Sequence, residues 1–122
     1  MTYALKTAAN EELVELFAKI ALKQYDAIEG GDNVRFRTLF KQIDDVSNEL
    51  RSRDGDQRRM LMALYVHDNS QVRLKAAVHT LAVAPVEARA ELESIARLQW
   101  EYQAGDAGMT LCLLDNGTFK PS

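Results

Sequence analysis

Few side chains in this sequence have the types and spacing that metal chemistry requires. Its two histidines, His67 and His79, stand 12 positions apart, one in a predicted turn and one on a predicted helix. A zinc site needs three or four converging ligands, and the sequence has no HxxxH, CxxC or ExxH spacing. We therefore expect both histidines at or near the surface, with no metal ion and no other cofactor bound.

The residue types of nucleophilic catalysis are equally sparse. Cys112 is the single cysteine and lies in the apolar run LCLLD, whereas Ser70 stands where a helix should begin. A reactive thiol needs a neighbouring base and an electropositive setting, and the sequence shows neither near Cys112. We interpret Cys112 as a buried, inert thiol and Ser70 as a helix cap. The sequence predicts that the protein is not an enzyme.

The densest cluster of basic residues could bind the phosphates of a nucleic acid. It falls in the segment RSRDGDQRR, residues 51–59, and consists of Arg51, Arg53, Arg58 and Arg59. Two aspartates lie inside the segment, and no aromatic residues interleave to stack on bases. A solvated loop and a nucleic-acid patch are the two interpretations, and we favour the loop.

A second charged surface lies on the helix predicted to begin at Asp32 or Asn33. Its charges are Arg35, Arg37 and Lys41 in the first half and Asp44, Asp45 and Glu49 in the second half. The helix dipole favours the opposite order, with acidic residues near the start, and each misplaced charge costs about 0.3–1 kcal/mol. A surface arranged against its own stability indicates another role, so we interpret these six residues as a candidate surface for a partner.

The single tryptophan, Trp100, has two interpretations. It falls at the edge of the apolar sector of a predicted helix, where it could border the core. It could also be an exposed anchor for a partner, as tryptophan often is in interfaces. We favour the edge of the core.

The composition indicates a soluble helical domain. Of the 122 residues, 47% are hydrophobic and 27% charged, but only 7% are aromatic, a balance that favours helices over sheets. A net charge of −3 gives no overall attraction to nucleic acid or to an anionic membrane. No signal peptide is evident, and no run approaches the ~20 apolar residues of a membrane span. Because a single cysteine suits a reducing compartment, we expect a cytoplasmic protein.

Six predicted helices must position these residues. Apolar residues recur at three- and four-residue spacing, and glycine, proline and cap residues separate the segments. We expect helices over residues 10–29, 33–50, 57–66, 70–84, 85–104 and 106–114. Gly30-Gly31 should end the first helix, and Gly105 should end the fifth.

Helices joined by short turns favour antiparallel hairpins. We expect an all-α fold, an α-α superhelix of about three hairpins, as a single domain over residues 1–122. Residues 1–9 and 118–122 should be held loosely. The second helix should bury one apolar face, made of Phe36, Leu39, Phe40, Ile43, Val46 and Leu50.

The predicted helix over residues 70–84 is apolar on two opposite sides. Leu74 and Ala77 fall in one sector of a helical wheel, and Val72 and Ala76 fall in a nearly opposite sector. A helix with this pattern is buried between neighbours on both sides. Ala77 should therefore be buried, whereas Gln71 should lie at the surface, where a change to glutamate would have little effect.

This region also resembles a HEAT-type helical repeat over about residues 60–96. The run Asn69-Ser-Gln-Val72-Arg73, followed by Ala76-Ala77 and Leu81, is similar to the second helix of such a repeat. The stretch LKAAVHTLAVAP is similar to small uncharacterised bacterial HEAT-like proteins. The resemblance departs at His67, because HEAT repeats usually place there an acid that helps to hold the repeat's arginine.

The resemblance implies an α-α superhelix that grips other macromolecules, and it implies no particular ligand. We expect a non-catalytic protein–protein interaction module, with a bacterial regulator, an adaptor and an immunity-type protein as alternatives. Its partner should be another protein and not a membrane. The second hypothesis is a nucleic-acid-associated helical repeat that uses the loop from Arg51 to Arg59.

Overall fold

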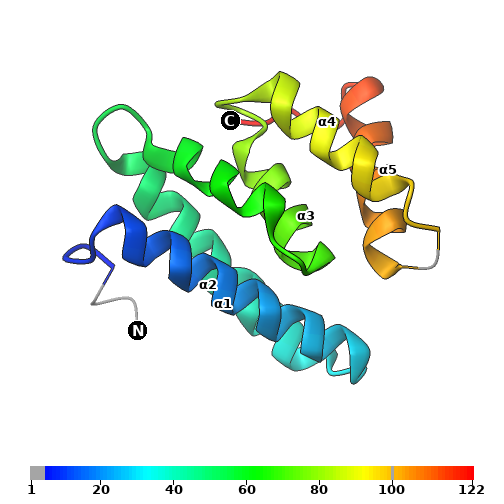
Figure 1. Cartoon of the computed structure of the whole chain (residues 1–122), viewed down its shortest axis with the longest axis horizontal. Helices are drawn as coiled ribbons and strands as arrows, with labels where there is room; N and C mark the ends of the chain where they lie inside the picture. The colour runs from blue at the N-terminus through cyan, green and yellow to red at the C-terminus, as the bar shows by residue number, and fades with distance from the viewer. Residues whose placement is uncertain (1–4, 100) are drawn as a thin grey trace. The chain divides into compact units, whose positions relative to one another are not determined.

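Every regular element in the described part of the chain is a helix (Figure 1). The computed structural model describes residues 5–99 and 101–122. Within them lie α1 (Asn10–Glu29), α2 (Asn33–Ser52), the 3-10 helix η2 (Gln57–Val66), α3 (Ser70–Thr80), α4 (Pro85–Ala96) and α5 (Tyr102–Asp115). The predictions of an all-α fold and of six helices are confirmed for these residues. None of the six is both long and apolar enough to cross a membrane.

The chain divides into two compact units, and the boundary between Met60 and Leu61 falls inside η2. Unit 1, which ends at Met60, is built on the hairpin of α1 and α2 (Figure 1). Gly31 turns the chain with a φ of 68°, in the left-handed region that glycine adopts readily. Asp32 then caps α2, because its Oδ1 accepts a 3.0 Å hydrogen bond from the Arg35 amide. The predicted stop at Gly30-Gly31 is confirmed, and of the two expected caps, Asp32 and Asn33, the structure has Asp32.

The apolar face of α2 is narrower than its sequence pattern predicts. Leu39, Ile43, Val46 and Leu50 are buried, as expected. The prediction is wrong for Phe40, which is 44% exposed, and Phe36 is only half-buried. On a helical wheel Phe40 stands about 90° from the centre of the buried face. It therefore lies at the border of that face, where only the surrounding fold decides whether a side chain is covered.

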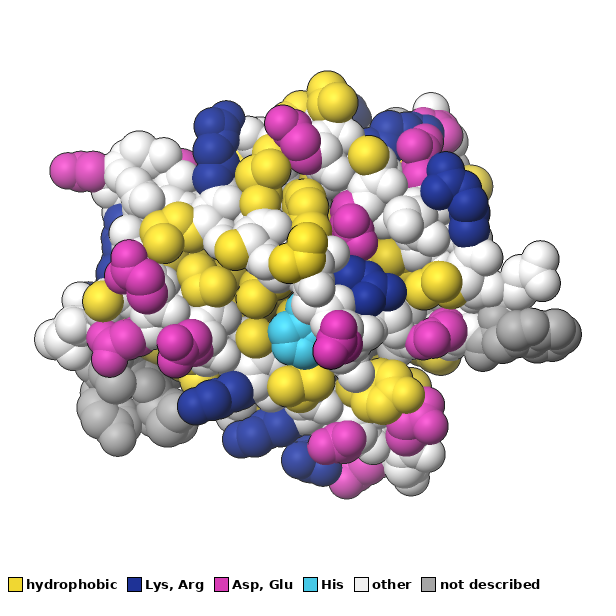
Figure 2. Space-filling model, in the orientation of Figure 1, with side chains coloured by type: hydrophobic (Ala, Val, Ile, Leu, Met, Phe, Trp, Pro, Cys, Tyr) yellow, Lys and Arg dark blue, Asp and Glu magenta, His cyan; other side chains and the backbone are white. Residues whose placement is uncertain are grey.

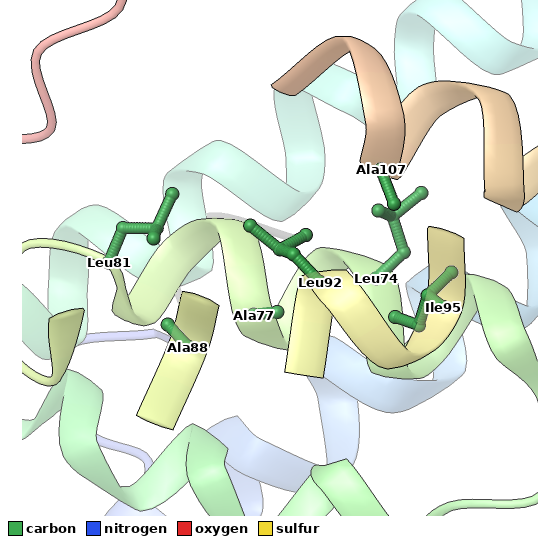
Figure 3. Packing of buried hydrophobic residues seen from close by; sticks show 7 residues of the cluster. All are labelled: Leu74, Ala77, Leu81, Ala88, Leu92, Ile95 and Ala107. Atoms are coloured by element: carbon green, nitrogen blue, oxygen red, sulfur yellow. The ribbon is translucent and has the colours of Figure 1, made fainter. Parts of the chain in front are cut away.

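Unit 2 packs α3, α4 and α5 around one hydrophobic cluster (Figure 3). Helix α3 contacts both α4 and α5, and α4 contacts α5. The cluster consists of Leu74, Ala77, Leu81, Ala88, Leu92, Ile95 and Ala107. Its three alanines let the helix backbones approach closely, because a methyl group keeps neighbouring helices apart less than a larger side chain does. Pro85 occupies the first position of α4, as predicted.

Helix α3 is buried on two opposite sides, as its sequence predicts. Leu74 and Ala77 belong to the cluster of unit 2, and Val72 and Ala76 on the other side are fully buried. The helix ends at Thr80, earlier than expected. Ala84 precedes a proline and has φ −146° and ψ 64°, because a residue before proline is kept out of the helical region.

The third helical segment has the predicted bounds but a tighter winding. In the 3-10 helix η2, residues three apart lie in one row along the helix. One such row is Met60, Ala63 and Val66, and Val66 is 88% exposed. The other two rows of η2 contain Leu61, which is fully buried, and Tyr65. Tyr65 Oη lies 2.5 Å from Thr80 Oγ1 of α3.

The prediction that Gly105 ends the fifth helix is wrong. Helix α4 ends at Ala96, and α5 begins at Tyr102 and contains both Gly105 and Gly108. A glycine inside a helix costs only about 1 kcal/mol relative to alanine. Burial of Ala107 against α3 and α4 outweighs that cost, so tertiary packing overrides the local signal.

Leu5 and Phe119, near the two ends of the described chain, contact the rest of their units. Leu5 is buried, and its carbonyl oxygen accepts a 2.8 Å hydrogen bond from Arg53 Nη2. The Phe119 amide donates to Leu113 O at 3.0 Å, and its ring packs against the cluster of unit 2. These contacts hold Leu5 and Phe119 in place, and residues 1–4 lie outside the described part of the chain.

Gln71 lies in a buried polar network that joins the beginnings of α3 and α5. It is 1% exposed, and its Oε1 accepts a 3.0 Å hydrogen bond from Gln103 Nε2. Ser70 Oγ lies 3.2 Å from Gln103 Oε1 and 2.7 Å from Glu101 Oε2. The prediction that Gln71 lies at the surface is wrong, because a partner 32 positions away along the chain covers its amide.

Replacing Gln103 with leucine should destabilise the fold. The change removes the buried hydrogen bond from Gln103 Nε2 to Gln71 Oε1, and the loss of such a bond costs about 0.5–1.5 kcal/mol. Urea unfolding followed by circular dichroism measures the free energy of unfolding. The same change at Gln99, which is exposed, should alter that free energy by less than about 0.5 kcal/mol. Equal losses for the two variants would show that the network does not hold α5 to α3.

Candidate functional site

The first half of α2 presents the cations that the sequence analysis selected. Arg35, Arg37 and Lys41 are exposed. Their side chains make no hydrogen bond or ion pair with any residue in 5–99 or 101–122. Because no neighbour neutralises them, their charge is available to a partner.

Exposed apolar side chains accompany these cations. Val34 is 67% exposed and Phe40 is 44% exposed. The ring of Phe40 lies 6.4 Å from that of Phe36 between centroids, in a tilted arrangement that suits aromatic pairs. Aromatic residues and arginine are enriched in protein interfaces. We name Val34, Arg35, Arg37, Phe40 and Lys41 the α2 surface.

The acidic residues of the predicted surface have different surroundings. Asp44 and Asp45 are half-buried, and Glu49 Oε2 accepts a 3.0 Å hydrogen bond from Arg53 Nε in an ion pair. Glu49 therefore has a structural contact inside unit 1. The six-residue surface predicted from the sequence separates into a free basic half and a partly engaged acidic half.

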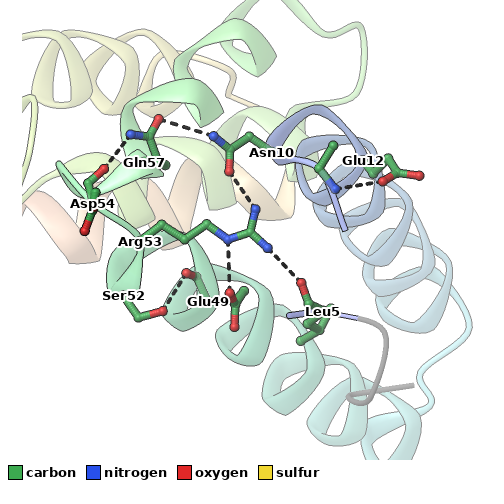
Figure 4. Close-up of polar contacts among 9 residues, drawn as sticks. Leu5, Asn10, Glu12, Glu49, Ser52, Arg53, Asp54 and Gln57 are labelled. Carbon is green, nitrogen blue, oxygen red and sulfur yellow. Dashed lines mark hydrogen bonds and ion pairs between the residues drawn. The ribbon is translucent and has the colours of Figure 1, made fainter. Parts of the chain in front are cut away.

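Arg53 is a structural residue of unit 1 and not an open contact for phosphate (Figure 4). Its guanidinium donates to Asn10 Oδ1 and to Leu5 O, at 2.8 Å each, in addition to Glu49. Gln57 Oε1 lies 3.5 Å from Asn10 Nδ2. These bonds connect α2 to the start of α1 and to the beginning of η2.

Arg58 is also engaged within its own segment. It is buried, and it donates to Asp56 Oδ1 at 2.9 Å and to Asp56 Oδ2 at 2.7 Å. These hydrogen bonds hold the pKa of Asp56 below its usual value. Of the four arginines in the predicted basic patch, Arg51 and Arg59 are the exposed ones.

The residues considered for catalysis or metal binding do not converge. Among residues 5–99 and 101–122, no group of three or more His, Cys, Asp or Glu side chains could hold a metal ion. His67 is half-buried, and its Nδ1 accepts a 3.0 Å hydrogen bond from the Asn69 amide. The interpretation of Cys112 as a buried thiol is wrong, because it lies on the exposed side of α5. Trp100 lies outside the described residues.

Arg73 of α3 is held by backbone carbonyls and by a glutamate of α4. Arg73 Nη1 donates to His67 O at 2.7 Å and to Asp68 O at 3.1 Å. Its Nε also lies 3.5 Å from Glu91 Oε2 on α4. Burial raises the pKa of Glu91, and the charge of Arg73 partly offsets that rise. Backbone carbonyls of the preceding turn and Glu91 thus fix the position of the Arg73 guanidinium.

The sequence analysis missed two residues of this site, Phe40, which it assigned to the core, and Val34. Val34 lies at the start of α2, just before Arg35 and outside the apolar face of the helix, so an apolar pattern with helical spacing does not select it. The one signal in the sequence was an apolar residue in a polar, charged segment, which would have indicated an exposed apolar side chain. On the face drawn in Figure 2, basic and acidic side chains are interspersed and hydrophobic side chains also reach the surface. Among the described residues, the face in Figure 2 therefore has no large area of a single charge that would indicate a binding surface.

Comparisons with known proteins agree with the helical fold. The family model described as "Domain of unknown function (DUF2019)" matches residues 11–115. The crystal structure of the protein RPA1889 from Rhodopseudomonas palustris CGA009 is similar to this chain, with 52% sequence identity and a TM-score of 0.93. The match covers 97% of this chain and 98% of that chain. The search of curated proteins found no match.

Proposed function

The chain belongs to the family described as domain of unknown function (DUF2019), and we propose that it is a non-catalytic protein–protein interaction module. The α2 surface is the observation that supports this function. It combines three cations without a described partner with Val34 and Phe40, which are substantially exposed. Burying those two side chains on association would contribute favourable free energy at about 25 cal/mol per Å² of apolar area.

The chemistry of the α2 surface defines the partner. Three positive charges in two helical turns call for acidic side chains, and Val34 and Phe40 call for apolar ones. We propose an acidic protein segment with an apolar face, in a bacterial cytoplasm, so that the chain acts as a regulator, an adaptor or an immunity-type protein. Complementary charges mainly speed association, whereas the apolar contacts slow dissociation.

We also propose that α3, with the part of η2 that belongs to unit 2, forms a HEAT-like repeat. Burial of α3 on two sides and the small residues Ala76 and Ala77 support this relationship. The arginine at the start of α3 is held by the turn that precedes it, through His67 O and Asp68 O. The 3-10 winding of η2 is a departure from the α-helical pair of such repeats.

Changing both Arg35 and Arg37 to glutamate should abolish partner binding and preserve the fold. Arg35 is the third residue of α2, so glutamate there would suit the helix dipole. We expect the midpoint of thermal unfolding to rise slightly. The proteins that the wild type captures from a lysate of the source organism should be lost, as measured by quantitative mass spectrometry.

The control is Arg97→Glu, which reverses an exposed charge on unit 2 and should retain those captured proteins. Identical capture by the wild type and the double variant would contradict a binding role for α2. The nucleic-acid hypothesis would instead be favoured by two results together. The wild type would be retained on duplex DNA at physiological salt, and changing Arg51 and Arg59 to glutamate would abolish that retention.

A further inference from the structure

A cavity of about 210 Å³ lies between α1 and α2 in unit 1. It is lined by Leu5, Leu16, Ile20, Lys23, Gln42, Asp45 and Val46. The apolar side chains Leu5, Ile20 and Val46 are buried, whereas Lys23 and Gln42 are exposed and Asp45 is half-buried. The cavity therefore has an apolar floor and a polar rim that reaches solvent.

Regular secondary structure holds the cavity walls in place. Leu16, Ile20 and Lys23 are spaced by four and three residues and share one face of α1. Gln42, Asp45 and Val46 share one face of α2 in the same way. Leu5 also lines the cavity, and the Arg53 guanidinium holds its backbone through the 2.8 Å bond to Leu5 O. The site is thus preformed, as small-molecule sites usually are.

The three polar side chains of the rim have no side-chain partner among the described residues. Lys23, Gln42 and Asp45 make no side-chain hydrogen bond or ion pair with any residue that the structure describes. Lys23 and Asp45 carry opposite charges and line the same cavity, yet no ion pair joins them. A ligand that satisfies both charges at once must itself carry an anion and a cation.

We propose that this cavity binds a small apolar zwitterion, namely a free aliphatic α-amino acid. Its ammonium group would bind Asp45, its carboxylate would bind Lys23, and the Gln42 amide would donate to or accept from either group. The aliphatic side chain would pack on Leu5, Ile20 and their apolar neighbours. The cavity volume of about 210 Å³ is smaller than the volumes of about 300–1,000 Å³ of pockets for drug-sized molecules. It therefore suits a smaller ligand, such as a free amino acid.

The test is a titration of the full chain, labelled with ¹⁵N, with L-leucine and L-isoleucine, followed by NMR. Saturable shifts should appear at the amides of Leu16, Ile20 and Asp45. Glycine lacks the apolar side chain, and N-acetyl-L-leucinamide lacks both charges, so each should bind at least ten times more weakly. The absence of saturation by either amino acid up to about 10 mM, above a millimolar dissociation constant, would overturn the proposal.

Variants of the rim separate the zwitterion from simple apolar contact. Lys23→Gln and Asp45→Asn should each weaken L-leucine binding at least tenfold without changing the thermal midpoint by more than a degree or two. Lys19→Gln and Asp26→Asn change exposed charges of α1 outside the cavity and should leave the affinity unchanged. Equal affinities for the rim variants and the wild type, or equal binding of the neutral amide, would show that the charges do not recognise the ligand.

Discussion

Changing Ala77 to glutamate should remove most of the stability of unit 2. Ala77 is fully buried in the cluster with Leu74, Leu81 and Leu92 (Figure 3). A carboxylate there has no room and no partner, and an unpaired buried charge costs several kcal/mol. Native domains have only about 5–15 kcal/mol of stability in total. We expect the helical signal in circular dichroism to melt at least ~15 °C lower, given about 4–8 °C for each kcal/mol in domains of 60–100 residues.

The matched control for this variant is Ala90→Glu. Ala90 is also an alanine in a helix of unit 2, but it lies on the exposed side of α4. Glutamate at that position stays solvated, so its effect should stay within about 0.5 kcal/mol. Equal thermal midpoints for the two variants would refute the buried position of α3.

Changing Phe17 to alanine should have the largest effect in unit 1. Phe17 is fully buried on α1, and it is the largest of the fully buried side chains in the described residues. Its removal takes away apolar burial and leaves a cavity, which together cost about 3–5 kcal/mol for phenylalanine. Urea unfolding should show a lower midpoint with an unchanged slope, since the amount of surface exposed on unfolding stays nearly the same.

Phe40→Ala makes the same substitution at a phenylalanine that is 44% exposed. It loses mainly the ring contact with Phe36, so we expect a loss of about 1 kcal/mol or less. This variant should nevertheless weaken partner binding through the α2 surface. If Phe17→Ala is as mild as Phe40→Ala, the described core of unit 1 is wrong.

Local patterns predicted the elements that local interactions determine. Gly30-Gly31 and Asp32 act on neighbouring backbone groups, and the observed turn and cap follow from those residues alone. The apolar spacing of α2 predicted Leu39, Ile43, Val46 and Leu50 in the core. It could not decide Phe40, because a side chain at the border of a face is covered only if another element reaches it.

The candidate site shows the same division between local and distant causes. The charges on α2 were evident from the sequence, since a charge order opposed to the helix dipole is a property of one helix. The sequence did not show that Arg53 and Glu49 belong to a structural network. Arg53 binds Asn10 and Leu5, which are 43 and 48 positions away along the chain. The cavity bordered by Lys23 and Asp45 also needs two helices, so the sequence analysis did not predict it.

By itself, the sequence determined an all-helical chain, the positions of most helix starts, the two-sided burial of α3 and the charge order of α2. Each of these depends on residues within about one or two helical turns of each other, over which spacing and capping act directly. The tertiary structure alone decided that Gln71 is buried, that Gly105 lies inside a helix, that Cys112 is exposed and that three rim side chains surround an apolar cavity. The physical reason is that burial and partner choice depend on which distant segments pack together, and packing free energy can exceed the ~1 kcal/mol that a local signal contributes.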